Sequence, residues 1–216
     1  MSLPPRVLRF ELLKTAAELS RLGLNKGTAG NVSARFEDGM MITPSGVPAA
    51  RLSPASMVEI DSHGRFHGEC APSSEWRFHR DIYAARPDVG AVVHTHAPFC
   101  TTIACQRRGI PAFHYMIAVA GGRDIRCSDY ATFGSQALSD VAVAALEGRR
   151  ACLLANHGMI ATGPTLDAAL KLTQEVEELA EQYWRVLQIG EAIVIPDDEM
   201  DRVLEKFRGY GQPRKA

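Results

Sequence analysis

The sequence predicts an α/β layered domain with a mixed or antiparallel sheet, on three observations. Short apolar runs typical of strands gather in the middle of the chain, at residues 91–95, 151–154 and 159–161. Segments with apolar residues at helical spacing flank them, at 8–22 and 166–189. No internal repeat or long linker divides the 216 residues. We therefore expect residues 1–216 to form a single domain with helices packed on one sheet.

The first third of the chain predicts one helix followed by short strands. Apolar residues recur at helical spacing over 8–22, and Gly23 ends the pattern. A second strand closes on Thr43-Pro44-Ser45-Gly46, a strong turn signal. The expected strands of this region are a short one entered through the glycine-rich turn 27–33, then 40–42, and a hairpin of 58–61 with 65–67.

The remainder alternates helices and strands. Ser73-Ser74-Glu75 predicts the start of a helix that Pro87 stops, so this helix should cover 73–86. Further helices are expected at 98–106, 135–146, 166–189 and 199–208, and strands at 91–95, 151–154 and 159–161.

Composition argues against several classes of protein. The chain has 24 basic and 25 acidic residues, so a net charge of −1 offers no electrostatic attraction to nucleic acid or an acidic membrane. No apolar run approaches the roughly 20 residues of a membrane span, and the N-terminus lacks a signal pattern. Five scattered cysteines without a Cys-x-x-Cys pair suit a reducing compartment. We expect a cytoplasmic protein.

Three of the seven histidines predict a metal site. His94 and His96 lie two apart in a predicted strand, so both side chains point to the same face. His157 lies in a glycine-bounded turn after a second strand. Buried imidazoles need partners, and three neutral imidazoles suit a divalent ion such as zinc, with cobalt and manganese open. A pair of surface histidines is the alternative, which the preceding Ala91-Val92-Val93 disfavours.

Glu75 is a candidate fourth ligand or general base. It falls early in the helix predicted from Ser73, where the helix dipole favours a carboxylate. Taken alone it would be interpreted as an N-terminal capping glutamate, and only the three histidines give it a chemical role. His79, four residues later, either orients Glu75 or is a packed surface residue.

Three turns rich in small polar residues suggest a phosphate site. Backbone amides and hydroxyls at such turns, the last at a helix N-terminus, can hold a phosphate without basic side chains. Each turn alone would be an ordinary turn or cap. Beside a metal site they indicate a small phosphorylated substrate. The turns are Thr28-Ala29-Gly30-Asn31, Ser45-Gly46 and Ser73-Ser74.

Over nearly its whole length the chain resembles the class II aldolase/adducin family. The motifs that carry the resemblance are residues 27–33, 42–46, 72–79, 94–97, 110–116, 130–134 and 156–158. They are specific, and within the family they are nearest to the branch that cleaves L-fuculose 1-phosphate. The resemblance implies a three-layer α/β/α domain with a central, mostly antiparallel sheet, assembled as a homotetramer with active sites between subunits.

The resemblance also implies a role for each candidate residue. One zinc ion per subunit would be held by His94, His96 and His157, with Glu75 binding when the substrate is absent. Tyr115 would reach into the site of a neighbouring subunit. Thr28, Asn31, Ser45, Gly46, Ser73 and Ser74 would hold the substrate phosphate, and Phe133 and Tyr210 would shape the aldehyde end.

The implied activity is that of an aldehyde-lyase. A metal-dependent enzyme would cleave a ketose 1-phosphate to dihydroxyacetone phosphate and a short aldehyde, with Glu75 and Tyr115 moving protons. The ketose would be L-fuculose 1-phosphate, a 5-deoxypentulose 1-phosphate or methylthioribulose 1-phosphate.

Two other functions remain open on the same scaffold. A sugar-phosphate 4-epimerase would carry an aspartate at position 75, where this chain has glutamate. A non-catalytic adducin-type module would lack metal histidines, and this chain has all three.

Overall fold

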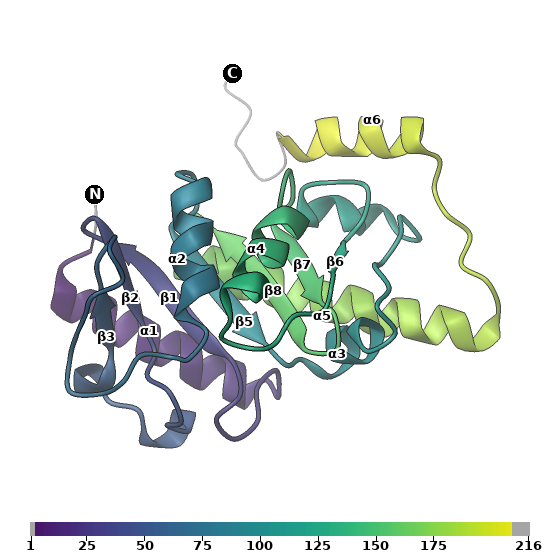
Figure 1. The fold of residues 1–216 in the computed structure, drawn as a ribbon. Helices are drawn as coiled ribbons and strands as arrows, with labels where there is room; N and C mark the ends of the chain where they lie inside the picture. Colours follow the sequence, from purple (N-terminus) through teal and green to yellow (C-terminus); the bar gives the residue numbers. More distant parts are fainter. Residues whose placement is uncertain (1–2, 209–216) are drawn as a thin grey trace.

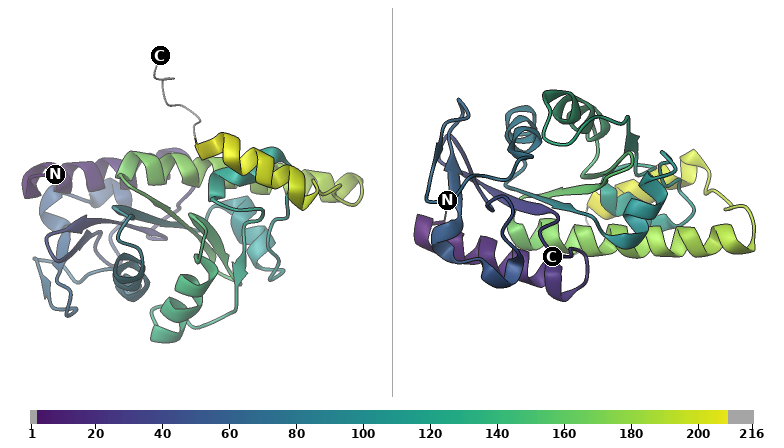
Figure 2. Two further views of the ribbon diagram at one scale, coloured as in Figure 1. Left: turned by 90° about the horizontal axis from the view of Figure 1, so that it is seen from above. Right: turned by 60° about the horizontal axis from the view of Figure 1, so that its bottom comes forward.

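In the computed structural model, which describes residues 3–208, the chain folds into a sheet covered by helices on both faces (Figures 1 and 2). The eight strands found in this range follow the order β4-β3-β2-β1-β5-β8-β7-β6, and every neighbouring pair except β6–β7 is antiparallel. The predicted α/β class with a mostly antiparallel sheet is therefore confirmed. The strands are β1 (Asn31–Phe36), β2 (Gly39–Ile42), β3 (Val58–Ile60), β4 (Phe66–His67), β5 (Ala91–Thr95), β6 (Cys127–Ser128), β7 (Ala151–Leu154) and β8 (Gly158–Gly163).

Two apolar cores hold the three layers together. One lies between the sheet and α1, α3 and α5, with Leu12 and Val93 fully buried in it. The other lies between the opposite face and α2 and α4, around Phe78 and Val92. Val92 and Val93 point to opposite faces because strand side chains alternate. The α-helices are α1 (Pro5–Arg21), α2 (Trp76–Ala85), α3 (Pro98–Ala104), α4 (Gln136–Ala145), α5 (Leu166–Ile189) and α6 (Asp197–Arg208).

The helix expected from Ser73 begins three residues later, at Trp76. The backbone N–H of Ser73 donates to the carbonyl of Thr43, and Pro44 pairs with Pro72, so this segment is held extended beside the 43–46 turn. Glu75 occupies the N-cap position, and its side chain makes no capping hydrogen bond. The prediction of the helix start was therefore wrong, because tertiary pairing outweighs the local helix signal.

Several short elements gave no sequence signal. The 3₁₀ helix η3 (Tyr115–Ala120) and the two-residue strand β6 were not predicted, and 3₁₀ turns also occur at Ala49–Arg51 and Pro54–Ser56. All are too short for a hydrophobic period to form. The last helix begins at Asp197, two residues before its expected start.

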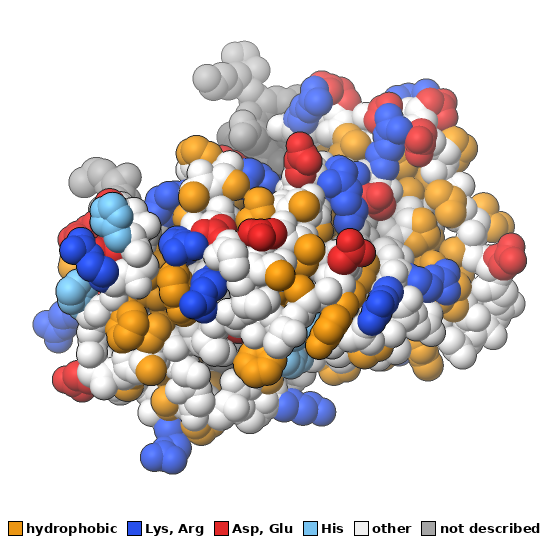
Figure 3. Space-filling view, viewed as in Figure 1, with side chains coloured by type: hydrophobic (Ala, Val, Ile, Leu, Met, Phe, Trp, Pro, Cys, Tyr) orange, Lys and Arg blue, Asp and Glu red, His pale blue; other side chains and the backbone are white. Residues whose placement is uncertain are grey.

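The surface seen in Figure 3 mixes acidic and basic side chains, with no large region of one sign. Within residues 3–208, no helix combines the length and the apolar character needed to cross a lipid bilayer.

Candidate metal centre and cleft

His94 is the best-anchored side chain of the site. It lies on β5 and is fully buried. Its Nδ1 lies 2.9 Å from the carbonyl oxygen of Met159 on the neighbouring strand β8. A carbonyl only accepts hydrogen bonds, so Nδ1 carries the proton and Nε2 presents a lone pair. The sheet thus sets both the position and the tautomer of His94.

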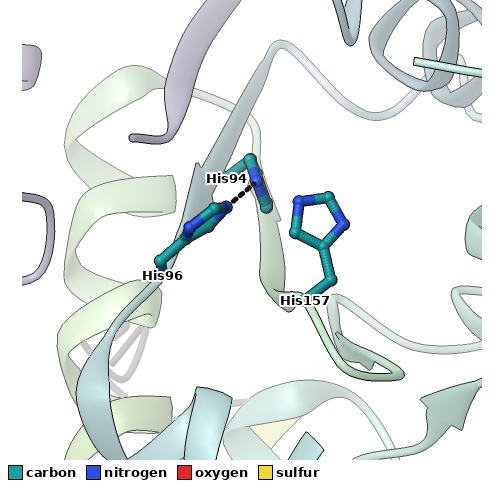
Figure 4. Close-up of side chains that lie close together, drawn as sticks. All are labelled: His94, His96 and His157. Atoms are coloured by element: carbon teal, nitrogen blue, oxygen red, sulfur yellow. Dashed lines mark hydrogen bonds between the residues drawn. The ribbon is translucent and has the colours of Figure 1, made fainter. Parts of the chain in front are cut away.

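His96 and His157 bring their rings to the same point (Figure 4). His96 follows the end of β5, and its Nε2 lies 3.2 Å from Nε2 of His94. His157 comes from the turn between β7 and β8, with ring centroids 4.8 Å from His94 and 4.9 Å from His96. The three histidines offer ligand atoms within 4.8 Å of one another, and they form the one such group found in residues 3–208. The predicted convergence of these histidines is confirmed.

The turn that carries His157 is closely constrained on both sides. Asn156 adopts a left-handed backbone with φ 54°, a conformation that asparagine tolerates better than most residues. At Gly158, a Cβ atom would lie 2.3 Å from the carbonyl oxygen of Thr95. Only glycine therefore lets β8 approach β5 closely enough to bring His157 beside His94.

Glu75 completes the cluster. Its Oε2 lies 3.2 Å from Nε2 of His94, and its Oε1 lies 3.2 Å from Nε2 of His157. The side-chain amide of Asn31 donates to Oε2 at 3.0 Å. Oε1 is buried and accepts no hydrogen bond. Imidazole lone pairs and carboxylate oxygens facing one point are the donor set of a divalent cation, so the residues present fit such an ion.

The protonation states suit ligation. Burial, with a smaller effect from His94, lowers the pKa of both His96 and His157 to about 4. Burial acts to raise the pKa of Glu75, but the neighbouring His94 and His157 and the Asn31 amide outweigh it and hold that pKa well below its usual range. At neutral pH the two imidazoles are neutral and the carboxylate is ionised, as metal binding requires.

A cleft of about 290 Å³ opens above the cluster, a size suited to a small molecule. Glu75, His96 and His157 lie on its wall. All six residues expected to hold a phosphate line the same cleft: Thr28, Asn31, Ser45, Gly46, Ser73 and Ser74. The structure therefore brings the predicted phosphate residues and three of the four metal residues to one cavity, which no arginine or lysine of residues 3–208 lines.

Two serines of the cleft, Ser45 and Ser73, offer hydroxyl groups rather than backbone amides. The N–H groups of Ser45 and Ser73 donate to the carbonyls of Ala71 and Thr43. Ser73 and Ser74 precede the first turn of α2, where the helix dipole favours an anion. The expectation that backbone amides of these turns cradle a phosphate is thus wrong for Ser45 and Ser73, because both amides hold the two segments together.

The remaining predicted residues differ in position. Phe133 lines the cleft and is 69% exposed. Tyr115 is 51% exposed at the start of η3 and is not among the residues that line the cleft. Tyr210 lies outside the described residues. Tyr130 and Asn156 also line the cleft, and were not assigned a role from sequence, although each lies within a motif of the family resemblance.

His79 is fully buried, so the alternative of a surface residue was wrong. Its Nε2 lies 2.5 Å from Oδ1 of Asn31, and its Nδ1 lies 2.7 Å from Oγ of Ser33. Burial, with a smaller effect of His94, lowers the pKa of His79 from 6.5 to about 3. The ring is therefore neutral throughout the physiological range.

We expect the three histidines to dominate zinc affinity. His96→Ala removes one of three converging imidazoles, and zinc affinity should fall more than about 100-fold. Competition with a chromophoric chelator measures this directly. His67→Ala, at an exposed hairpin position, is the matched control and should bind zinc as the unchanged chain does. Equal affinity in both variants would contradict the site.

Acid should destabilise the chelator-treated protein partly through His79. The unfolded state takes up a proton near pH 6.5, whereas folded His79 resists protonation down to about pH 3. The contribution is therefore complete above pH 6.5 and is lost as the pH falls toward 3, by about 1.4 kcal/mol per pH unit. Urea unfolding of the wild type between pH 7 and 4.5 should show a steeper decline than that of His79→Gln. Parallel curves would refute the assignment.

Comparison with known proteins assigns the chain to a family. The family model described as Class II Aldolase and Adducin N-terminal domain matches residues 10–184. A 5-methylthioribulose-1-phosphate/5-deoxyribulose-1-phosphate aldolase of Rhodospirillum rubrum is 66% identical over 204 residues, covering 94% of this chain and 92% of that protein. An L-fuculose phosphate aldolase of Escherichia coli is 50% identical over 205 residues, covering 94% and 95%.

The fold agrees with these sequence relationships. A solved structure of an L-fuculose 1-phosphate aldolase superposes with a TM-score of 0.90 at 42% identity, covering 93% of this chain and 96% of that one. With a family model that spans most of the chain and relatives matched over almost their full length, this chain belongs to the class II aldolase and adducin family.

Proposed function

We propose that this chain is a metal-dependent class II aldolase that reversibly cleaves a ketose 1-phosphate to dihydroxyacetone phosphate and a short aldehyde. The observation that carries the proposal is the meeting of His94, His96, His157 and Glu75 beside a cleft lined by small hydroxyl-bearing residues. A cation at one end and hydroxyl donors at the other suit a substrate with a carbonyl near a phosphate.

The relatives narrow the substrate. One of the two relatives is named for 5-methylthioribulose 1-phosphate and 5-deoxyribulose 1-phosphate, and the other for L-fuculose phosphate. These ketoses share the half that becomes dihydroxyacetone phosphate and differ in the aldehyde. Identity is higher to the protein named for the first two, 66% against 50%. We therefore place the methylthio and 5-deoxy sugars first and L-fuculose 1-phosphate second.

Discrimination between these aldehydes is expected to be modest. A methyl or thioether difference in an apolar pocket is worth only about 1–3 kcal/mol. The exposed rings of Phe133 and Tyr130 on the cleft wall are suited to contact such a group. Tyr210 keeps its proposed place at the aldehyde end, and acceptance of more than one sugar is part of the proposal.

The metal would be held by His94, His96 and His157, and we propose zinc, with cobalt or manganese as substitutes. When bound, such an ion supplies Lewis-acid stabilisation of the negative charge that develops on the substrate oxygens as the C3–C4 bond breaks. Glu75, ionised and within 3.2 Å of two of the imidazoles, would move the proton at C3. The hydroxyls of Thr28, Ser45, Ser73 and Ser74, with Asn31 and Gly46, would orient the phosphate.

Tyr115 would act on the aldehyde oxygen from a neighbouring subunit. Its ring is half exposed and lies away from the residues that line this chain's own cleft. A residue so placed can serve catalysis only if another copy of the chain brings a cleft to it. We therefore propose a homotetramer with sites between subunits, and a cytoplasmic location stays a prediction.

The two rival functions are less well supported. A glutamate stands at position 75, where the epimerase branch is expected to carry aspartate. A non-catalytic module would have no need for three histidines and a carboxylate that meet at one point, with Glu75 and His94 buried. Proton exchange at C3 together with sugar cleavage separates the aldolase from both rivals.

We expect exchange of one C3 proton of dihydroxyacetone phosphate with heavy water, because this half-reaction needs no aldehyde. Proton NMR should show stereospecific exchange that a chelator abolishes and zinc restores. Glu75→Gln should slow it by about 100-fold or more. Release of dihydroxyacetone phosphate from the three candidate sugars then ranks the aldehydes. Zinc-loaded protein that neither exchanges the proton nor cleaves any of the sugars would sink the proposal.

Mixed oligomers test the role of Tyr115. Glu75→Gln and Tyr115→Phe should each be nearly inactive alone. Co-assembled in equal amounts they should regain about a quarter of wild-type activity, because some sites then combine an intact Glu75 with an intact partner tyrosine. Glu75→Gln mixed with His96→Ala is the control, since both residues line one chain's cleft and no intact site can form. No recovery in the first mixture would place Tyr115 in its own chain's site or outside catalysis.

A further inference from the structure

Behind the cleft, a chain of buried polar groups runs from Glu75 into the interior between β1 and α2. Asn31 Nδ2 lies 3.0 Å from Glu75 Oε2, and Asn31 Oδ1 lies 2.5 Å from His79 Nε2. His79 Nδ1 lies 2.7 Å from Ser33 Oγ, which lies 2.8 Å from the hydroxyl of Tyr83. None of the five residues is more than 7% exposed. Most of these five hydrogen-bonded side chains are therefore shielded from bulk water.

The arrangement follows from two secondary-structure periods. Asn31 and Ser33 are two apart on β1, so both side chains project from the same face. Glu75, His79 and Tyr83 are spaced by four at and along α2, so they form one stripe on that helix. Packing this stripe on that strand face alternates the residues as Glu75, Asn31, His79, Ser33 and Tyr83.

The directions of the hydrogen bonds are determined from the Glu75 end. An ionised carboxylate only accepts, so the NH₂ group of Asn31 faces Glu75 and its oxygen faces His79. An amide oxygen only accepts, so His79 carries its proton on Nε2. Nδ1 of His79 then accepts from the hydroxyl of Ser33, and the Ser33 oxygen accepts from Tyr83. Every donor in the chain is thereby assigned, and each hydrogen bond supports the next.

Asn31 connects Glu75 to His79 through its side-chain amide. Its side-chain amide donates to Oε2 of Glu75, and within residues 3–208 the other carboxylate oxygen, Oε1, accepts no hydrogen bond. An asparagine amide can rotate by half a turn with little change in shape, which would set an oxygen against the carboxylate. The imidazole of His79 opposes this rotation, because its Nε2–H binds the amide oxygen and a rotated amide would lose both this hydrogen bond and the one to Glu75.

We propose that His79 is a positioning residue: through Asn31 it holds Glu75 in the orientation required for proton transfer. The effect on catalysis rests on the proposed function. The orientation of Asn31 by His79 does not depend on that function. His79 itself does not reach the substrate, because it lies beneath Asn31 and does not line the cleft.

Two amide substitutions at position 79 separate positioning from packing. Glutamine can place a side-chain N–H where Nε2–H of His79 lies, whereas asparagine is too short to reach Asn31. His79→Gln should keep C3 proton exchange close to the wild-type rate. His79→Asn should lose about 10- to 100-fold. Both changes replace a buried ring by a polar amide, so a general packing defect would affect them alike.

Ser139→Ala controls for loss of stability in α2. Ser139 is fully buried on α4 and donates to Asp81 of α2 at 2.6 Å, on the side away from the polar chain. The Ser139→Ala substitution should lower the free energy of unfolding without slowing C3 proton exchange. Loss of exchange in this variant in proportion to its stability would overturn the proposal, and so would equal rates in His79→Gln and His79→Asn.

The tautomer of His79 provides a readout independent of activity. In protein labelled with ¹⁵N at histidine, the resonance that disappears in His79→Gln should show a neutral ring protonated at Nε2. A ring protonated at Nδ1 would refute the directed chain. If the wild type shows this tautomer but exchanges no C3 proton, the proposed function fails while the link from His79 to Asn31 holds.

Discussion

The position of β5 between β1 and β8 is the constraint on which the cleft depends. In this register His94 lies opposite Asn31 on one side, and Thr95 lies opposite Met159 on the other. The carbonyl of Met159 then fixes the His94 ring, and Asn31 reaches Glu75. A slip by one residue would turn His94 to the opposite face of the sheet and separate it from both partners.

The apolar layers make this register costly to change. Val92 and Val93 are fully buried in different cores, so an altered pairing would expose one set and crowd the other. The close approach of β8 at Gly158 adds a steric limit, since the space above the Thr95 carbonyl admits no side chain. The sheet therefore carries His94, directs His96 just beyond the end of β5 and orients the turn that carries His157.

Partial burial of the polar cluster contributes to its chemical character, since Glu75 and His94 are buried whereas His96 is exposed. Removing imidazoles and a carboxylate from water is unfavourable unless each finds a partner. Here the partners are the Met159 carbonyl, the Asn31 amide, one another and, in the proposed holoenzyme, a cation. Burial keeps the rings of His96 and His157 neutral, whereas the contacts of Glu75 outweigh burial and keep its carboxylate ionised. These states would suit both metal binding and the proposed proton transfer.

The metal cluster and the cleft agree with membership of the class II aldolase and adducin family. Two parts of the cleft would recognise different halves of the proposed substrate. In the proposed reaction, the metal cluster and the hydroxyl-lined wall would face the half common to all the candidate sugars. The exposed rings of Tyr130 and Phe133 line the same cleft and would contact the aldehyde half. Specificity would then depend on weak apolar contacts to these rings and, in the proposed tetramer, on the surface of a neighbouring copy.

The sequence by itself determined the elements with a clear period and the residues with one evident chemistry. Strand β7, strand β5 and helix α5 lie where their apolar patterns predict, and the spacing of His94 and His96 already indicates a shared ligand site. Only the tertiary structure decided features that arise from contacts between distant segments. Pairing of Ser73 with Thr43 delays the start of α2, and packing of α2 on β1 buries His79 and directs its hydrogen bonds to Asn31. The periodicity of apolar residues depends on one segment of the sequence and therefore predicts local structure. Hydrogen bonds across the sheet depend on which distant segments pair, and no local pattern contains that information.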